Sequence, residues 1–178
     1  MFIIEACVSK EHSAQRKLFE LYYAYGISIA LRYAKNKADA EEILSDAFLK
    51  VFLKIDQFDK RYEFKKWFRR IVINTSIDFL RKDKSFDTIY PEDDTLFDST
   101  FNTGWENLVY EDVLKAIQTL PKGYRKVFNL YAIDGYKHRE ISKLLGISVG
   151  TSKSNYARGR TILQKYLISQ NKEQVKHG

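Results

Sequence analysis

The chain has 178 residues, and its 30 Lys and Arg against 23 Asp and Glu give a formal net charge of +7. This length allows one large or two small domains with a hydrophobic core, and the positive charge is compatible with an anionic partner without demanding one. The single cysteine, Cys7, excludes an internal disulfide framework and fits a reducing cytoplasm, so we expect a cytoplasmic protein. No apolar run approaches the roughly 20 residues that cross a bilayer, so we expect no membrane insertion. Residues 1–4 are too short and lack the cationic start of a secretory signal.

Only two prolines and eight glycines, with abundant Leu, Lys, Glu, Ile and Ala, predict an all-α protein. The first helix is expected over residues 11–35, where apolar residues recur at helical spacing. Gly26 lies inside this pattern and costs about 1 kcal/mol relative to Ala, which indicates close packing or a local bend at this point.

Residues 38–54 predict a second helix. Asn36-Lys37 interrupts the first pattern, and Asp39 then places an acid in a new first turn, where the helix dipole favours it. Two interpretations of the face opposite its buried line stay open: dipole compensation on a solvated surface, or an acidic docking face for a basic protein partner. This face carries Asp39, Glu42, Ser45, Asp46 and Leu49.

The segment 64–82, FKKWFRRIVINTSIDFLRK, predicts a central helix. One apolar line begins at Phe64 and Phe68, and a second runs through Ile73 and Ile77, so this helix should contact neighbours on two sides of a bundle. A narrow strip lies between the two lines and consists of Trp67, Arg70, Asn74, Asp78 and Arg81.

Cations and aromatic rings gather at the start of this helix and in the preceding loop, 58–63. Phosphates take the charge of cations and bases stack on rings, so this composition is typical of a surface that binds a single nucleic-acid strand. A solvated helix face with a Trp at its boundary is the alternative. The candidate residues are Lys60, Arg61, Tyr62, Lys65, Lys66, Trp67, Arg69, Arg70 and Asn74.

Residues 85–107 contain no Lys or Arg, carry acids at 87, 92, 93, 94, 98 and 106, and show no helical period. This composition predicts an acidic linker, although its aromatic residues favour docking over a purely flexible tether. We therefore expect two small helical domains, 1–84 and 108–178, joined by a linker over 85–107.

The C-terminal part predicts helices near 109–120, 121–134, 137–145 and 149–168. A pair of helices joined by a turn that starts with Gly is the helix-turn-helix signature, and Gly146-Ile147-Ser148 joins the last two, with Ser148 a good N-cap. Small polar residues then open the second helix, which suits base edges in a major groove, whereas a generic helical hairpin is the alternative. The candidate DNA-binding residues are Arg139, Val149, Gly150, Thr151, Lys153, Ser154, Asn155 and Arg158.

No residue pattern indicates catalysis. His12, His138 and His177 form no ligand spacing, Cys7 is isolated, and no Gly-rich phosphate-binding loop is present. We expect a protein that is not an enzyme and uses no metal and no cofactor.

Three motifs, in this order along the chain, resemble those of one family. The run Asp39–Phe48, DAEEILSDAF, is similar to an acidic helix that docks on the polymerase clamp. The pattern from Phe64 to Arg81 resembles a helix that opens the minus-ten promoter element, and that from Leu120 to Arg158 resembles a domain that reads the minus-thirty-five element. Across essentially its whole length, the chain resembles a bacterial sigma factor of the extracytoplasmic-function group.

The resemblance implies both function and partners. It implies an RNA polymerase sigma factor that directs core RNA polymerase to specific promoters and assists their opening. Its partners would be core polymerase, promoter DNA as duplex and as opened strand, and an anti-sigma factor. A stand-alone helix-turn-helix regulator of duplex DNA is the alternative, and it leaves the two N-terminal surfaces unexplained. The implied polymerase-binding residues are Asp39, Glu42, Ser45, Asp46 and Leu49.

The chain departs from the family pattern at three places. Ser45-Asp46 stands where the family usually has Gln-Glu, so polymerase docking is expected to be weaker or reshaped. Ser152 replaces an apolar packing residue, and Asn155 replaces an Arg that contacts DNA. Since Asn pairs bidentately with adenine, we expect an altered upstream sequence preference.

Overall fold

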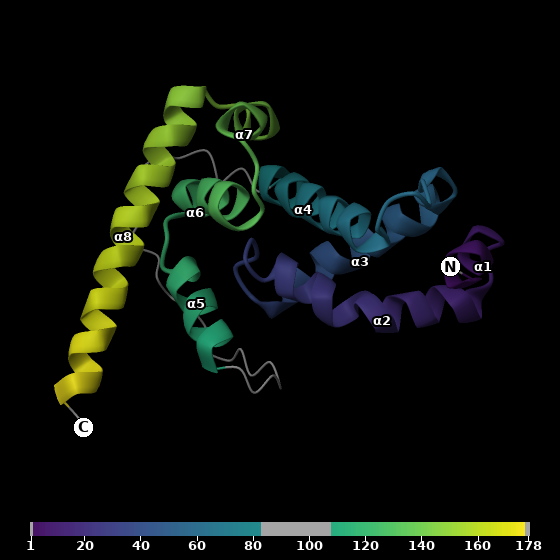
Figure 1. The fold of residues 1–178 in the computed structure, drawn as a ribbon, viewed down its shortest axis with the longest axis horizontal. Helices are drawn as coiled ribbons and strands as arrows, with labels where there is room; N and C mark the ends of the chain where they lie inside the picture. Colours follow the sequence, from purple (N-terminus) through teal and green to yellow (C-terminus); the bar gives the residue numbers. More distant parts are fainter. Residues whose placement is uncertain (1, 83–107, 177–178) are drawn as a thin grey trace. The chain divides into compact units, whose positions relative to one another are not determined.

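The computed structural model of the protein describes residues 2–82 and 108–176, with side chains described over 2–82 and 112–169. The described residues form helices and turns and contain no strand, so the predicted all-α fold is confirmed. The expected linker, 85–107, lies outside the described residues. The chain divides into two compact units, Met1–Lys82 and Asp83–Gly178, which are described separately (Figure 1).

The described part of unit 1 contains α1 (Phe2–Val8), α2 (His12–Ala30), α3 (Lys37–Lys54), the short 3₁₀ helix η1 (Ile55–Gln57) and α4 (Phe64–Lys82). Helices α2, α3 and α4 pack against one another in pairs, and α1 packs on α2 and η1. The Asn36 side chain accepts a 2.8 Å hydrogen bond from the Asp39 backbone N–H and so caps α3. Helix α4 has the predicted bounds, because residues of both apolar lines are buried along its length.

The core of unit 1 is built around Phe68 of α4, which is fully buried. Its ring lies 5.5 Å from that of Tyr22 in α2 and 5.0 Å from that of Phe48 in α3, between centroids. Gly26 of α2 faces the same point: a Cβ atom there would overlap Leu44 Cδ1 of α3 and lie 3.0 Å from Phe68 Cζ. The close packing predicted at Gly26 is therefore confirmed, and it lets three helices meet at one point.

Helix α1, which the sequence pattern did not predict, ends in a Schellman motif. The Lys10 N–H donates to Cys7 O at 3.0 Å and the Glu11 N–H donates to Ala6 O at 3.1 Å, while Lys10 has a φ of 60°. Cys7 is buried, and burial raises the pKa of its thiol. These contacts fix α1 against the rest of unit 1.

The described part of unit 2 contains α5 (Leu108–Gln118), α6 (Lys122–Phe128), the π-helical turn η3 (Asn129–Ile133), α7 (His138–Leu145) and α8 (Val149–Lys176). Its core joins Ala116 and Leu120 to Leu163 of α8. Helix α8 has 28 residues and is the longest described helix (Figure 1). The predicted end near residue 168 was therefore wrong.

The turn between α7 and α8 has the chemistry expected of a helix-turn-helix. Gly146 ends α7 in the left-handed conformation, with a φ of 66°. Ser148 Oγ accepts a 2.9 Å hydrogen bond from the Thr151 N–H and so caps α8, and Ser142 Oγ donates to Ile147 O at 2.6 Å. Ile141 is fully buried. These contacts hold α7 and α8 together as a pair.

Candidate polymerase and nucleic-acid interfaces

The predicted docking residues lie on α3, away from its buried line. The exposed members are Glu42, Ser45 and Leu49, and the half-buried members are Asp39 and Asp46. Sequence reasoning missed Leu53, whose side chain follows Leu49 by one helical turn. Leu49 is 58% exposed and Leu53 is 69% exposed, so two large apolar side chains continue the acidic face. The spacing 42, 46, 49, 53 was the signal that would have identified Leu53. We call these residues, from 39 to 53, the α3 face.

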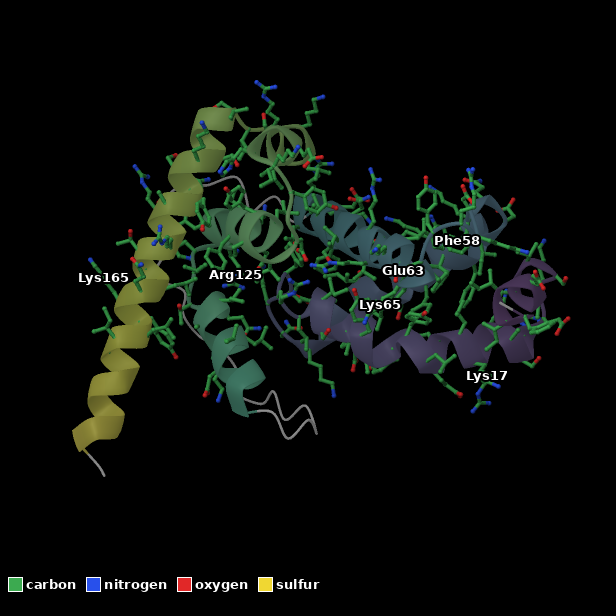
Figure 2. All side chains as sticks on the ribbon, viewed as in Figure 1. Lys17, Phe58, Glu63, Lys65, Arg125 and Lys165 are labelled. Carbon is green, nitrogen blue, oxygen red and sulfur yellow. The ribbon has the colours of Figure 1, made fainter. Side chains whose placement is uncertain are left out.

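The two aromatic side chains of the predicted strand surface differ in exposure. Tyr62 in the loop 58–63 is 69% exposed. Trp67 is half-buried, with its ring 5.2 Å from Phe58 and 5.6 Å from Phe64, and both of these phenylalanines are buried (Figure 2). Tyr62 is thus the exposed ring of this surface, whereas Trp67 packs on two buried rings of unit 1.

Three of the predicted cations are paired with carboxylates. Lys60 Nζ lies 2.6 Å from Glu5 Oε1 of α1, and Lys66 Nζ lies 2.9 Å from Glu63 Oε2. Arg61 Nη2 donates to Asp59 Oδ2 at 2.6 Å, and Arg61 Nε donates to the same carboxylate. These hydrogen bonds hold the pKa of each carboxyl, Glu5, Asp59 and Glu63, below its usual range.

The remaining residues of this surface are arranged differently. Lys65 Nζ lies 4.6 Å from the Tyr25 ring centroid, a cation–π contact that fixes its position (Figure 2). Within residues 2–82, exposed Arg70 forms no hydrogen bond or ion pair, and the half-buried Asn74 amide forms no hydrogen bond. Arg69 is half-buried. Arg70 and Asn74 therefore offer donors that the folded unit does not itself use.

In unit 2, the helix-turn-helix gathers the predicted residues on α7 and the first three turns of α8. Arg139 and Lys153 are exposed, and neither forms an ion pair within the described part of the chain. Among the described residues, exposed Arg158 has one polar contact, a long one of 3.4 Å from its Nη1 to the Tyr124 hydroxyl. Asn155 is half-buried, and its amide has no hydrogen-bond partner among the described residues.

The other predicted residues of α8 are small and lie at its N-terminus. Gly150 is exposed and Val149 is half-buried. The Thr151 and Ser148 hydroxyls lie 2.9 Å apart, and Ser154 Oγ donates to Thr151 O at 3.0 Å. The hydroxyls of Thr151 and Ser154 thus both form local hydrogen bonds. Among the predicted residues from Val149 to Asn155, Lys153 and Asn155 are the ones whose side-chain polar groups form no hydrogen bond with a described residue.

The structure explains why a serine occupies the packing position 152. Ser152 is fully buried, and its Oγ lies 2.9 Å from His138 Nδ1 at the start of α7. The His138 ring stacks on Tyr131, with centroids 4.2 Å apart. A hydrogen bond therefore joins α7 to α8 at position 152, and sequence reasoning gave His138 no role.

Arg125 belongs to the motif that resembles the upstream-reading domain, and its guanidinium is occupied inside unit 2. Arg125 (labelled in Figure 2) donates from Nη2 to Gln118 O, in the last residue of α5, at 2.5 Å and to Leu120 O, in the turn that follows, at 3.0 Å. Burial lowers the pKa of Arg125 to about 10. This cation ties α5 to α6 and is not available to DNA.

The described residues contain no group of three or more His, Cys, Asp or Glu side chains that could hold a metal ion. None of the helices in the described ranges is both long and apolar enough to span a membrane.

Comparisons with known proteins match both units. The family model for Sigma-70 region 2 matches residues 18–86, and that for Sigma-70 region 4 matches residues 110–163. The ECF RNA polymerase sigma factor SigW of Bacillus subtilis is 30% identical, over 88% of this chain and 90% of its own length. The ECF RNA polymerase sigma-E factor of Escherichia coli K12 is 26% identical, with the same coverage of each chain.

Two solved structures share the fold. CnrH in complex with the cytosolic domain of CnrY has a TM-score of 0.51 at 21% identity, covering 94% of this chain and 96% of that one. The sigma factor RpoE of Bartonella quintana, in complex with the anti-sigma factor NepR, has a TM-score of 0.52 at 22% identity, covering 85% and 95%. The alternative of a stand-alone helix-turn-helix regulator is not favoured, because it does not account for the region 2 match. The chain belongs to the extracytoplasmic-function group of RNA polymerase sigma factors.

Proposed function

We propose that the two units divide the work of promoter recognition. Unit 1 docks on core polymerase through the α3 face and holds the opened downstream strand on the loop 58–63 and the start of α4. Helices α7 and α8 of unit 2 read the upstream element as duplex. The functional domains are then 1–84 and 108–178, joined by the linker 85–107, so that each bound domain raises the effective concentration of the other at its promoter element.

One observation carries this proposal: unit 1 separates two chemically different faces, and unit 2 carries a third. The α3 face combines carboxylates with exposed leucines, which suits a basic protein partner. The loop and the start of α4 offer Tyr62, Lys65 and Arg70, which suit bases and phosphates.

At the downstream element, the exposed Tyr62 ring stacks on an unpaired base, and the free Asn74 amide hydrogen-bonds another base edge. Arg70 and Lys65 take phosphates. At the upstream element, Asn155 reads a base edge, while Arg139, Lys153 and Arg158 contact phosphates and set the register on the duplex.

The structures that share this fold also bear on how the protein is regulated. Both solved structures with this fold were determined in complexes, one of them with an anti-sigma factor. We infer that this chain also has an anti-sigma partner that competes with polymerase, that it acts in the cytoplasm, and that its contribution is binding rather than catalysis.

Promoter opening by reconstituted holoenzyme tests the division of work. Asn74→Ala and Tyr62→Ala should reduce permanganate reactivity at the downstream element while leaving closed-complex formation unchanged, because base–aromatic stacking is worth about 1–3 kcal/mol per base. Gln15→Ala, another half-buried amide without a described partner, is the matched control. Equal opening by folded Asn74→Ala and Tyr62→Ala proteins would remove the strand-holding role.

Assembly of purified variants with core polymerase tests the docking role of the α3 face. Reversing Glu42 and Asp46 to Lys should abolish assembly with core polymerase while leaving the helical content intact. Asp56→Lys, at an exposed carboxylate in η1 outside the α3 face, should assemble normally. If the variant with Glu42 and Asp46 reversed to Lys binds core polymerase with unchanged affinity, the carboxylates of the α3 face serve only to compensate the helix dipole and to keep the surface solvated.

A further inference from the structure

Three cations on the proposed strand surface are already neutralised in the free protein. Lys60 is held by Glu5 at 2.6 Å, Arg61 by Asp59 at 2.6 Å, and Lys66 by Glu63 at 2.9 Å. Glu5 lies on α1, whereas Asp59 and Glu63 both lie in the loop 58–63. Glu63 directly precedes α4 (Figure 2). The six side chains together carry no net charge.

The helix-turn-helix surface shows the opposite arrangement. Its Arg139 and Lys153 are exposed and form no ion pair within the described part of unit 2. A duplex that reaches this surface therefore meets cations that no carboxylate holds. A single strand that reaches unit 1 must first displace a carboxylate from each of Lys60, Arg61 and Lys66, and each displaced carboxylate then lies beside a phosphate.

We propose that Glu5, Asp59 and Glu63 are specificity-determining residues that mask the phosphate-binding cations of unit 1. This inference rests on the proposed function, in which the loop 58–63 and the start of α4 hold the opened strand. By pairing with these cations, the three carboxylates lower the affinity of unit 1 for any single strand, whatever its sequence. A strand is held only when stacking and base-edge contacts, at Tyr62 and Asn74, add to the weakened phosphate contacts.

The fixed position of Glu5 supports a built mask rather than a chance surface contact. Glu5 lies on α1, 55 residues before its partner in the chain, and α1 is held by the buried Cys7 and by the Schellman motif at Lys10. The carboxylate therefore reaches Lys60 from a helix that is anchored on α2 and η1.

A purely structural role predicts the opposite sign. If the ion pairs only hold the loop in shape, removing the carboxylates loosens the loop and weakens strand binding. If they mask the cations, removing them strengthens the binding of any single strand. The sign of the change therefore distinguishes the two roles.

The test uses the full chain and a random-sequence single-stranded DNA oligonucleotide, with binding followed by fluorescence anisotropy from 50 to 200 mM NaCl. The variant Glu5→Gln/Asp59→Asn/Glu63→Gln should bind about tenfold more tightly at the lowest salt, since exposed ion pairs each contribute a few-fold. Its salt slope should steepen by about 2, because single strands contribute about 0.7 for each phosphate neutralised.

Matched controls separate masking from the general gain of positive charge. Glu11→Gln/Glu20→Gln/Asp56→Asn removes three exposed carboxylates that are not paired with these cations, and it should change affinity much less. Adding Lys60→Ala/Arg61→Ala/Lys66→Ala to the unmasked variant should abolish its gain. Circular dichroism confirms that each variant is folded, and the single variant Glu5→Gln repeats the test with the smallest change.

The outcomes are distinct. Tighter binding and a steeper slope only in the unmasked variant support the inference. Affinity equal to that of the control variant, or weaker binding, overturns masking. If the unmasked variant keeps its gain after Lys60→Ala/Arg61→Ala/Lys66→Ala is added, the strand binds elsewhere on the chain, and the proposed function of the loop fails together with masking.

Discussion

The close packing at Gly26 determines how much an alanine at this position would change the free energy of unfolding of unit 1. An alanine Cβ at this position would overlap Leu44 Cδ1 and lie 3.0 and 3.2 Å from Phe68 Cζ and Cε1. Leu44 and Phe68 are both buried, so neither side chain can move aside into solvent. Overpacking costs about 1–3 kcal/mol, and an overlap with a buried side chain puts this site in the upper part of that range, about 2–3 kcal/mol, of which the higher helix propensity of Ala returns about 1 kcal/mol. We expect Gly26→Ala to lower the free energy of unfolding of unit 1 by about 1–2 kcal/mol.

Urea unfolding measures this change through Trp67 fluorescence, because Trp67 lies in the ring cluster of unit 1. Trp105→Phe removes the second tryptophan from all samples. The midpoint should fall by about 1 M, from a slope near 1–2 kcal/mol/M for a unit of this size. Gly159→Ala in α8, followed by far-UV circular dichroism because unit 2 then has no tryptophan, is the control: its Cβ would lie 3.4 Å from Tyr124 Cβ, an ordinary contact, so it should not destabilise unit 2.

A second variant isolates the clash itself. Leu44→Ala alone should cost about 2–5 kcal/mol as a cavity. In Gly26→Ala/Leu44→Ala, the new methyl group occupies part of that space, so the double variant should be at least about 1 kcal/mol more stable than the sum of the single changes predicts. Additive single changes, or a Gly26→Ala protein as stable as wild type, would refute the packing argument.

Three further outcomes are expected. Arg125→Met should destabilise unit 2 by about 2–4 kcal/mol, because it leaves the carbonyls of Gln118 and Leu120 without the guanidinium that donates to them. The fraction of protein that loses upstream binding should equal the unfolded fraction measured by circular dichroism. Ser152→Val and His138→Leu should show a coupling energy of about 1–2 kcal/mol in a double-mutant cycle of thermal unfolding, and the double variant should be nearly as stable as wild type. Additive effects of the two substitutions would mean that the hydrogen bond contributes nothing to stability. Asn155→Ala should relax preference at one base pair, by about 1–3 kcal/mol, in a binding selection over randomised upstream elements at fixed salt. Identical preferences of the two proteins would show that Asn155 reads no base.

The elements that sequence patterns predicted well are those whose local chemistry agrees with their packing. Helix α4 was bounded correctly because both of its apolar lines are buried. The turn between α7 and α8 was predicted from Gly146 and Ser148, whose left-handed conformation and N-cap are properties of a few neighbouring residues. The residues of the α3 face follow from the same helical periodicity, which extends to Leu53 although the sequence analysis stopped at Leu49.

The features that the sequence did not predict depend on partners far away in the chain. Helix α1 is short, with only seven residues, and it is held by packing on α2 rather than by its own periodicity. The ion pair between Glu5 and Lys60 and the hydrogen bond between His138 and Ser152 join different elements. Charge counts around the loop 58–63 could therefore not predict that Glu5 of α1 pairs with Lys60.

The length of α8 has a mechanical consequence. With 28 residues, this helix is a rod of about 42 Å whose first turns enter the proposed DNA groove and whose middle carries α5 through Leu163. A tilt of about 10° at the DNA end would swing the far end by about 7 Å, if the rod stays straight. The end of α8 near Lys176 thus moves much further than the first turns when the helix tilts. A spin label or fluorophore placed there would report a small tilt of the proposed DNA-reading turns as a large, easily measured displacement.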